Sequence, residues 1–185
     1  MKEMKKLFIT TLVIVLSIAF FAACGNQESE TPVDNGAAKE EETTSFGAFD
    51  SKTFEGKDVK ADVFKNSELT MVNIWGTFCG PCINEMPDLE KLSKEYDREK
   101  FQIIGLVSDN ATPGDESVRE ILDKTGATYT QIMNSESLSK GILSAVQAVP
   151  TTVFVDREGK IVNVSVGGKS YKDWKNLVND IMESM

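Results

Sequence analysis

Two cysteines separated by two residues carry the clearest chemistry in this sequence. Cys79 and Cys82 enclose Gly80 and Pro81, the chain contains no histidine, and its only other cysteine is Cys24. Two thiols at this spacing can carry two electrons, because the first can attack a partner disulfide and the second can resolve the mixed disulfide that forms. The pattern is therefore typical of thiol–disulfide exchange.

Two other interpretations of the pair remain open. A C-x-x-C pattern is also half of a zinc site, but a structural zinc ion takes four protein ligands, and Cys24 is the only further cysteine or histidine. We therefore expect no metal site. A purely structural disulfide is the second alternative, although a loop this short at the start of a helix makes a strained and reducible bond.

The residues around the pair predict a strand followed by a helix. Residues 69–75 are short and apolar, as a buried strand should be, and Pro81 suits the first position of a helix that starts near Gly80. Cys79 then lies at the helix N-terminus, where unpaired N–H groups and aligned peptide dipoles favour the thiolate. Cys82 lies in the first turn, within reach of a mixed disulfide on Cys79.

This helix has a buried side that includes Cys82. We expect the helix to run from Pro81 to about Asp97, with a kink at Pro87. Further positions on the side of Cys82 are Met86, Leu89, Ser93 and Tyr96. Because this side packs inward, Cys82 should be the shielded cysteine of the pair.

The rest of the chain alternates between strand and helix patterns. Upstream, we expect two short strands around Gly56 and a turn of helix over 62–65. Downstream, the expected elements are a strand over 101–107, a helix between Asp115 and Gly126, a minor strand over 131–133, a short helix over 138–145, a strand from Pro150 to Asp156, its hairpin partner over 161–166 and a last helix opened by a Ser170–Asp173 capping box. Such alternation predicts an α/β domain with a largely parallel central sheet.

The cysteine segment resembles a known family. Residues 75–82, Trp-Gly-Thr-Phe-Cys-Gly-Pro-Cys, resemble the active-site segment of thioredoxins, and residues 85–87, Glu-Met-Pro, resemble the membrane-tethered TlpA/ResA (redoxin) branch of that superfamily. Residues 149–152, Val-Pro-Thr-Thr, resemble the proline motif that faces the cysteines in these proteins. The resemblance covers residues 46–185 and implies a thioredoxin fold, in which a central mixed β-sheet is flanked by helices and an N-terminal β-hairpin extends the domain.

The resemblance also implies a site. Cys79 and Cys82 would form the redox-active disulfide, and Pro150 would follow a cis peptide bond beside them. Trp75, Phe78 and the backbone of Val149 and Pro150 would form a shallow apolar surface on which a partner polypeptide docks. Phe78 stands where thioredoxin has a second tryptophan. The remaining residues expected at this surface are Gly80, Pro81 and Thr151.

A proton acceptor for Cys82 is less obvious from the sequence. Thioredoxin places a buried aspartate two residues before the tryptophan, but Asn73 occupies that position here and cannot titrate. Glu85 is the best substitute, because side chains three residues apart on a helix are neighbours and the tethered relatives place a glutamate there. The alternative is an ordinary solvated glutamate on the helix surface.

The N-terminal 45 residues are expected to deliver and tether the domain. Residues 1–23 carry three lysines before a long apolar run, which indicates an export signal. The run ends in Ala22, Ala23 and Cys24, and resembles a bacterial lipoprotein signal in which Cys24 becomes the lipid-bearing N-terminus. An uncleaved signal anchor is the alternative, since the run approaches membrane-spanning length. Residues 24–45 would then be the lipidated cysteine and a disordered acidic linker, and residues 46–185 the folded domain.

Charge and composition restrict the partners. The chain has a net charge of −9, and removal of residues 1–23, with three lysines and one glutamate, would take it to −11. This acidity argues against nucleic acid as a partner. We expect a monomer without a cofactor, anchored as a lipoprotein outside the cytoplasm. Its expected partners are protein thiols and disulfides, and the resemblance implies a membrane thiol-transfer protein as electron donor. The acceptors it implies are apocytochrome cysteines, hence a role in cytochrome c biogenesis, or an oxidised repair enzyme, and no residue selects between them.

The leading hypothesis is a protein-disulfide reductase, since Gly80 and Pro81 form the dipeptide of reducing thioredoxins. A thiol peroxidase is one alternative, but the peroxiredoxin pattern Pro-x-x-x-Thr-x-x-Cys would need proline and threonine where Val72 and Gly76 stand. A Cu(I)- or haem-binding protein of related fold is another, and the lack of histidine disfavours it.

Overall fold

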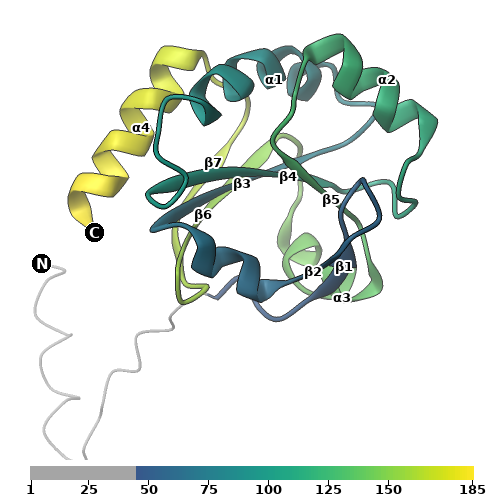
Figure 1. Ribbon diagram of the computed structural model, residues 1–185, viewed down its shortest axis with the longest axis horizontal. Coiled ribbons are helices and arrows are strands. Elements are labelled where there is room, and N and C mark those ends of the chain that lie inside the picture. Colours follow the sequence, from purple (N-terminus) through teal and green to yellow (C-terminus); the bar gives the residue numbers. More distant parts are fainter. Residues whose placement is uncertain (1–44) are drawn as a thin grey trace, which may run out of the picture. The chain divides into compact units, whose positions relative to one another are not determined.

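The computed structural model describes residues 45–185 (Figure 1). The expected export signal, Cys24 and the linker up to residue 44 lie outside the described residues. No helix within residues 45–185 is long and apolar enough to cross a membrane.

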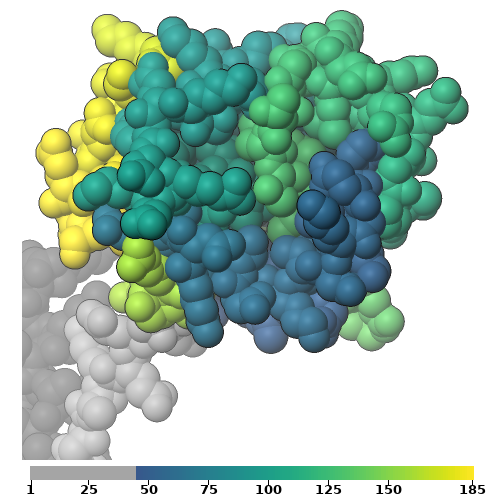
Figure 2. All heavy atoms as spheres, viewed as in Figure 1, coloured from purple at the N-terminus to yellow at the C-terminus, as the bar shows by residue number. Residues whose placement is uncertain are grey.

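The described chain begins with a small hairpin. Strands β1 (Asp50–Lys52) and β2 (Asp58–Lys60) pair antiparallel, and Gly56 takes the positive φ of 83° that the turn between them requires. The 3₁₀-helix η1 (Ala61–Asn66) follows. This confirms the expected N-terminal hairpin and turn of helix. Figure 2 shows the hairpin, in blue, beside the green segments that follow α2.

The central sheet has five strands in the order β5-β4-β3-β6-β7. Strands β3 (Leu69–Trp75), β4 (Phe101–Val107) and β5 (Thr130–Met133) run parallel. Strands β6 (Thr151–Asp156) and β7 (Ile161–Val166) form an antiparallel hairpin, and β6 pairs antiparallel with β3. The sheet is thus mixed, because the short turn after β6 cannot make the crossover that a parallel pair needs.

Helices cover both faces of the sheet. Helices α1 (Gly80–Ser93), α2 (Glu116–Thr125) and α4 (Tyr171–Ser184) lie on one face, and η1, the β1–β2 hairpin and α3 (Glu136–Lys140) lie on the other (Figure 1). The predicted caps are confirmed. The Asp115 carboxylate accepts from the backbone of Ser117 and Val118, Gly126 closes α2 in the left-handed region, and Ser170 accepts from the backbone of Asp173.

Two predicted helix boundaries are wrong. Helix α1 ends at Ser93 rather than near Asp97, because Asp97 belongs to the turn that enters β4, where its carbonyl accepts from Lys100 and Phe101. The expected helix over 138–145 is divided into α3 and the 3₁₀-helix η2 (Ile142–Ala145), which meet at Gly141. Pro87 lies inside α1, which continues through it.

A row of polar and small residues crosses the sheet beneath α1. The strand register places Asn73 of β3 beside Thr152 of β6 and Gly105 of β4, and it continues to Ser165 of β7 and Gln131 of β5. The other residues of β3 on this face, including Met71 and Trp75, belong to the apolar core with Cys82. The row therefore places buried polar groups under the helix that carries the cysteines.

Candidate active site

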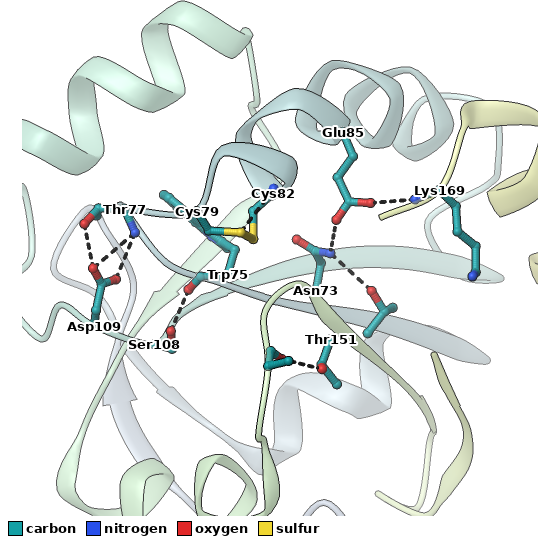
Figure 3. Close-up of a disulfide and its surroundings, with 12 residues drawn as sticks. Asn73, Trp75, Thr77, Cys79, Cys82, Glu85, Ser108, Asp109, Thr151 and Lys169 are labelled. Atoms are coloured by element: carbon teal, nitrogen blue, oxygen red, sulfur yellow. Dashed lines mark hydrogen bonds between the residues drawn. A yellow bond between two sulfur atoms is a disulfide. The ribbon is translucent and has the colours of Figure 1, made fainter. Parts of the chain in front are cut away.

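Cys79 and Cys82 form a disulfide at the N-terminus of α1 (Figure 3). Cys79 is the N-cap residue, and its Sγ accepts a hydrogen bond of 3.2 Å from the backbone N–H of Cys82. Pro81 occupies the first turn of the helix, as its missing N–H allows. Cys82 is fully buried and Cys79 is 6% exposed. This agrees with the expectation that Cys82 is the shielded cysteine.

The loop between β3 and Cys79 is held by the residues that follow β4. Both the backbone N–H and the hydroxyl of Ser108 donate to the Trp75 carbonyl, each at 2.8 Å. The Asp109 carboxylate accepts from the backbone N–H and the hydroxyl of Thr77, at 3.1 and 2.5 Å (Figure 3). Ser108 and Asp109 were not predicted as site residues, although the carboxyl ends of neighbouring parallel strands lie at the same edge of a sheet.

The proline loop before β6 has the peptide geometry that the resemblance implied. The Val149–Pro150 peptide bond is cis. The Pro150 carbonyl accepts from Gly167, and the Thr151 hydroxyl donates to the Ala148 carbonyl at 2.7 Å. Thr151 is buried, so its side chain braces this loop and is not exposed to a partner, which corrects its expected place on the docking surface.

Trp75 was also expected on the docking surface, and the structure shows otherwise. Its side chain is fully buried, and the indole N–H donates to the Gln131 Oε1 at 3.0 Å. Gly105 makes room for that amide, because a Cβ there would lie 1.9 Å from Gln131 Oε1. A lone glycine inside an apolar strand is the signal that could have indicated this close approach.

Several residues near the pair are exposed or half-buried, and two of them, Phe78 and Val149, line a groove without charged side chains. Phe78 is 75% exposed, Gly80 and Pro81 are exposed and Val149 is half-buried. The groove has a volume of about 560 Å³ and is lined by Phe78, Ser108, Asn134, Ser139, Leu143, Val146, Gln147, Ala148 and Val149. A partner segment that enters it would meet apolar and uncharged polar groups.

Glu85 is not a solvated surface residue. It is 5% exposed, and its Oε1 accepts from Asn73 Nδ2 at 3.0 Å. Its Oε2 accepts from the Lys169 backbone at 3.2 Å and from the Trp174 indole at 3.1 Å. Burial raises the pKa of Glu85 above its ordinary value, although these hydrogen bonds and the Lys169 charge oppose the shift. A buried carboxyl with a raised pKa holds a proton more readily than an exposed one, as a proton acceptor must.

Asn73 links Glu85 to the sheet. It is fully buried, and its Nδ2 donates to both Glu85 Oε1 and the Thr152 hydroxyl, the latter at 3.2 Å. Its Oδ1 is buried and has no hydrogen-bond partner. Asn73, which cannot titrate, is therefore in direct contact with the candidate proton acceptor.

Among residues 45–185, no group of three or more His, Cys, Asp or Glu side chains is placed to hold a metal ion. The fold, the disulfide at a helix N-terminus and the cis-proline before β6 together define a thiol–disulfide oxidoreductase of the thioredoxin class. The chain belongs to the Redoxin family, whose model matches residues 39–181.

Comparison with individual proteins supports this class. The thiol-disulfide oxidoreductase ResA of Halalkalibacterium halodurans is 31% identical over 112 residues, which cover 60% of this chain and 59% of that protein. ResA of Bacillus subtilis is 26% identical and matches over 96% of both chains. In fold, the chain is similar to a thiol:disulfide interchange protein of Chlorobium tepidum, with a TM-score of 0.64 and 24% identity over 76% of this chain and 97% of that one.

Proposed function

We propose that this protein reduces protein disulfides outside the cytoplasm while a lipid on Cys24 holds it at the membrane. The observation that carries the proposal is the position of Cys79, whose sulfur caps α1 and accepts from the Cys82 N–H. When the disulfide is reduced, the same N–H and the helix dipole stabilise a Cys79 thiolate. Phe78, Gly80 and Pro81, which adjoin Cys79 in sequence, are exposed, and this supports its role as the attacking cysteine.

The reaction conserves electrons through two exchanges. The Cys79 thiolate attacks one sulfur of the substrate disulfide, the substrate S–S bond breaks, and the leaving thiolate takes a proton from water. Cys82 then gives its proton to Glu85 and attacks Cys79, which releases the second substrate thiolate and leaves the Cys79–Cys82 disulfide. Two electrons have passed to the substrate. The reverse sequence, with a membrane thiol-transfer protein as donor, restores the dithiol.

The location and partners rest on the sequence and the resemblance. The lysine-led apolar segment 1–23 and the small residues before Cys24 support export and lipidation, and residues 24–45 would tether the 46–185 domain. The family resemblance supports a monomer that receives electrons in the membrane and delivers them to cysteines of exported proteins, including apocytochromes. The uncharged groove beside Phe78 supports a polypeptide as the substrate.

Trapping tests the roles of the two cysteines. The Cys82→Ser variant should accumulate mixed disulfides on Cys79, whereas Cys79→Ser should accumulate none. The wild type should catalyse insulin reduction by dithiothreitol, and peroxide turnover and Cu(I) titration should give no comparable signal. Capture by Cys79→Ser alone would reverse the assigned roles, and absence of insulin reduction would refute the reductase.

Lipidation is tested separately. In a bacterial host, the wild type should incorporate labelled palmitate and sediment with membranes, and Cys24→Ser should lose the label. Incorporation that survives this change would refute Cys24 as the lipid site.

A further inference from the structure

We propose that Asn73 is a positioning residue that bridges Cys82 and Glu85. Its side-chain amide can hydrogen-bond to both groups when the proton is on the Cys82 sulfur and also when it is on the Glu85 carboxyl. The inference rests on the proposed function, because it concerns how Cys82 is deprotonated before it attacks Cys79. Asn73 itself neither gains nor loses a proton.

The fold places Asn73 between the two groups. Asn73 lies on β3 between Met71 and Trp75, which face the apolar core that contains Cys82. Side chains alternate along a strand, so the Asn73 side chain points toward the same helix, α1. Cys82 and Glu85 are three residues apart on α1 and are therefore neighbours on its surface. One side of the Asn73 amide already contacts Glu85.

The other side of the amide carries an unmatched acceptor. Both N–H groups of Nδ2 are used by Glu85 and Thr152, while Oδ1 is buried without a partner. In Figure 3 the Asn73 oxygen lies on the side of the amide that faces Cys82. Buried acceptors are almost always paired, so this one needs an explanation. The disulfide offers it no donor, but a reduced Cys82 carries an S–H.

The amide fits both positions of the proton. With the proton on Cys82, the S–H donates to Asn73 Oδ1 and Nδ2 donates to the Glu85 carboxylate. With the proton on Glu85, a half-turn of the amide lets Oδ1 accept from the Glu85 O–H while Nδ2 donates to the Cys82 thiolate. The Thr152 hydroxyl can accept in the first state and donate in the second. One proton leaves sulfur and one arrives on oxygen, and no other group changes its charge.

The other charged and titratable groups near Glu85 come from the segments before β5 and α4. Lys169, from the segment before α4, acts on the Glu85 carboxylate through its backbone N–H and its charge. Tyr129, before β5, senses the charge of Glu85, but burial raises the pKa of Tyr129 so that it stays neutral. Trp174, on α4, donates its indole N–H to Glu85 Oε2. Among these contacts of Glu85, Asn73 is the one with a buried acceptor left over for the side of Cys82.

A double-mutant cycle on the full chain tests the bridge kinetically. Asn73→Leu should slow disulfide exchange about tenfold in the wild-type background and less than twofold when Glu85→Gln is already present. Asn84→Leu, an exposed asparagine on α1, is the matched control and should change the rate less than twofold. An equal loss from Asn73→Leu in both backgrounds, or no loss in either, would overturn the proposal.

A nuclear magnetic resonance measurement on the wild type needs neither activity nor a buried substitution. The Asn73 side-chain amide signals should shift when dithiothreitol reduces the disulfide, and their pH dependence in the oxidised protein should disappear in Glu85→Gln. Amide signals that are the same in both redox states would overturn the bridge, even if Asn73→Leu fails to fold. If the protein reduces insulin but shows no shift, only the bridge fails. If it shows the shift but reduces no protein disulfide, only the proposed function fails.

Discussion

The two halves of helix α1 bury one glutamate each, and the two carboxylates are held in different ways. Near the cysteines, the hydrogen-bond donors to Glu85 are an amide, an indole and a backbone N–H. Near the other end, Glu90 accepts from the backbone and hydroxyl of Thr128, both at 2.7 Å, and forms a 2.6 Å ion pair with Lys94. Burial acts to raise the pKa of both, but for Glu90 the bonds to Lys94 and Thr128 outweigh it and lower the pKa.

Under the proposed function, this contrast separates a proton carrier, Glu85, from a structural anchor, Glu90. A carboxylate paired with an ammonium group stays charged and fixes two elements together, here α1 and the segment that enters β5. A carboxylate that is buried among neutral donors lies closer to the balance between its two protonation states. Burial alone therefore does not indicate a functional glutamate, and the charge of its hydrogen-bond partners decides the difference.

The largest expected effect is on catalysis at Glu85. Glu85→Gln keeps the shape of the side chain, but it replaces one of the two acceptor oxygens with an NH2 group and cannot accept a proton. Disulfide exchange should therefore slow about 100-fold, in the range of general base catalysis. Stopped-flow measurement of insulin or glutathione disulfide reduction checks this. Glu90→Gln on the same helix should retain the wild-type rate. Equal rates for both variants would remove Glu85 from the mechanism.

The next effect is on stability, and here Glu90 should dominate. Glu90→Ala leaves the Thr128 backbone N–H and hydroxyl without their acceptor and should lower the free energy of unfolding by about 1–3 kcal/mol. Urea unfolding followed by circular dichroism gives this value. A Glu90→Ala variant with the same urea midpoint of unfolding as the wild type would contradict the structural role of Glu90.

A fall in pH should change the contributions of Glu85 and Glu90 to folding stability in opposite directions. The pKa of Glu85 is raised from 4.5 in the folded protein, so its contribution to stability is complete below pH 4.5 and is lost as the pH rises through the folded pKa. The pKa of Glu90 is lowered from 4.5, so its contribution is present above pH 4.5 and is lost as the pH falls through the folded value. Unfolding midpoints measured across this pH range check both effects. The loss of stability with rising pH should be absent in Glu85→Gln, and the loss with falling pH should be absent in Glu90→Gln. Trends of the same sign would contradict the assignment.

Local patterns allowed much of this fold to be predicted. The buried strands, the helix caps at Asp115 and Ser170 and the helix start at Cys79 each depend on residues close in sequence. The confirmed cis bond at Pro150 came from the resemblance.

The inside of the site could not be predicted in this way. Trp75 turned inward because Gln131, 56 positions away, supplies its acceptor through a space left by Gly105. The link between Asn73 and Glu85 likewise depends on how α1 lies over β3. Side-chain direction at the end of a strand follows from sheet register, and the register was not part of the sequence signal.

The smallest expected effect concerns a third carboxylate, Asp109, which is exposed and bonded only to neutral groups of Thr77. If partner charge and burial together decide function, Asp109 should hold the loop without taking part in proton transfer. Asp109→Ala should therefore slow exchange only a few-fold and shift no feature of the pH–rate profile, since exposed hydrogen bonds contribute roughly 1 kcal/mol or less. Thr77→Val removes the hydroxyl that donates to Asp109, and it should have the same small effect on the exchange rate as Asp109→Ala. A displaced pH–rate profile in Asp109→Ala would show that an exposed carboxylate sets the thiol chemistry, and the contrast drawn from Glu85 and Glu90 would then not extend to the loop before Cys79.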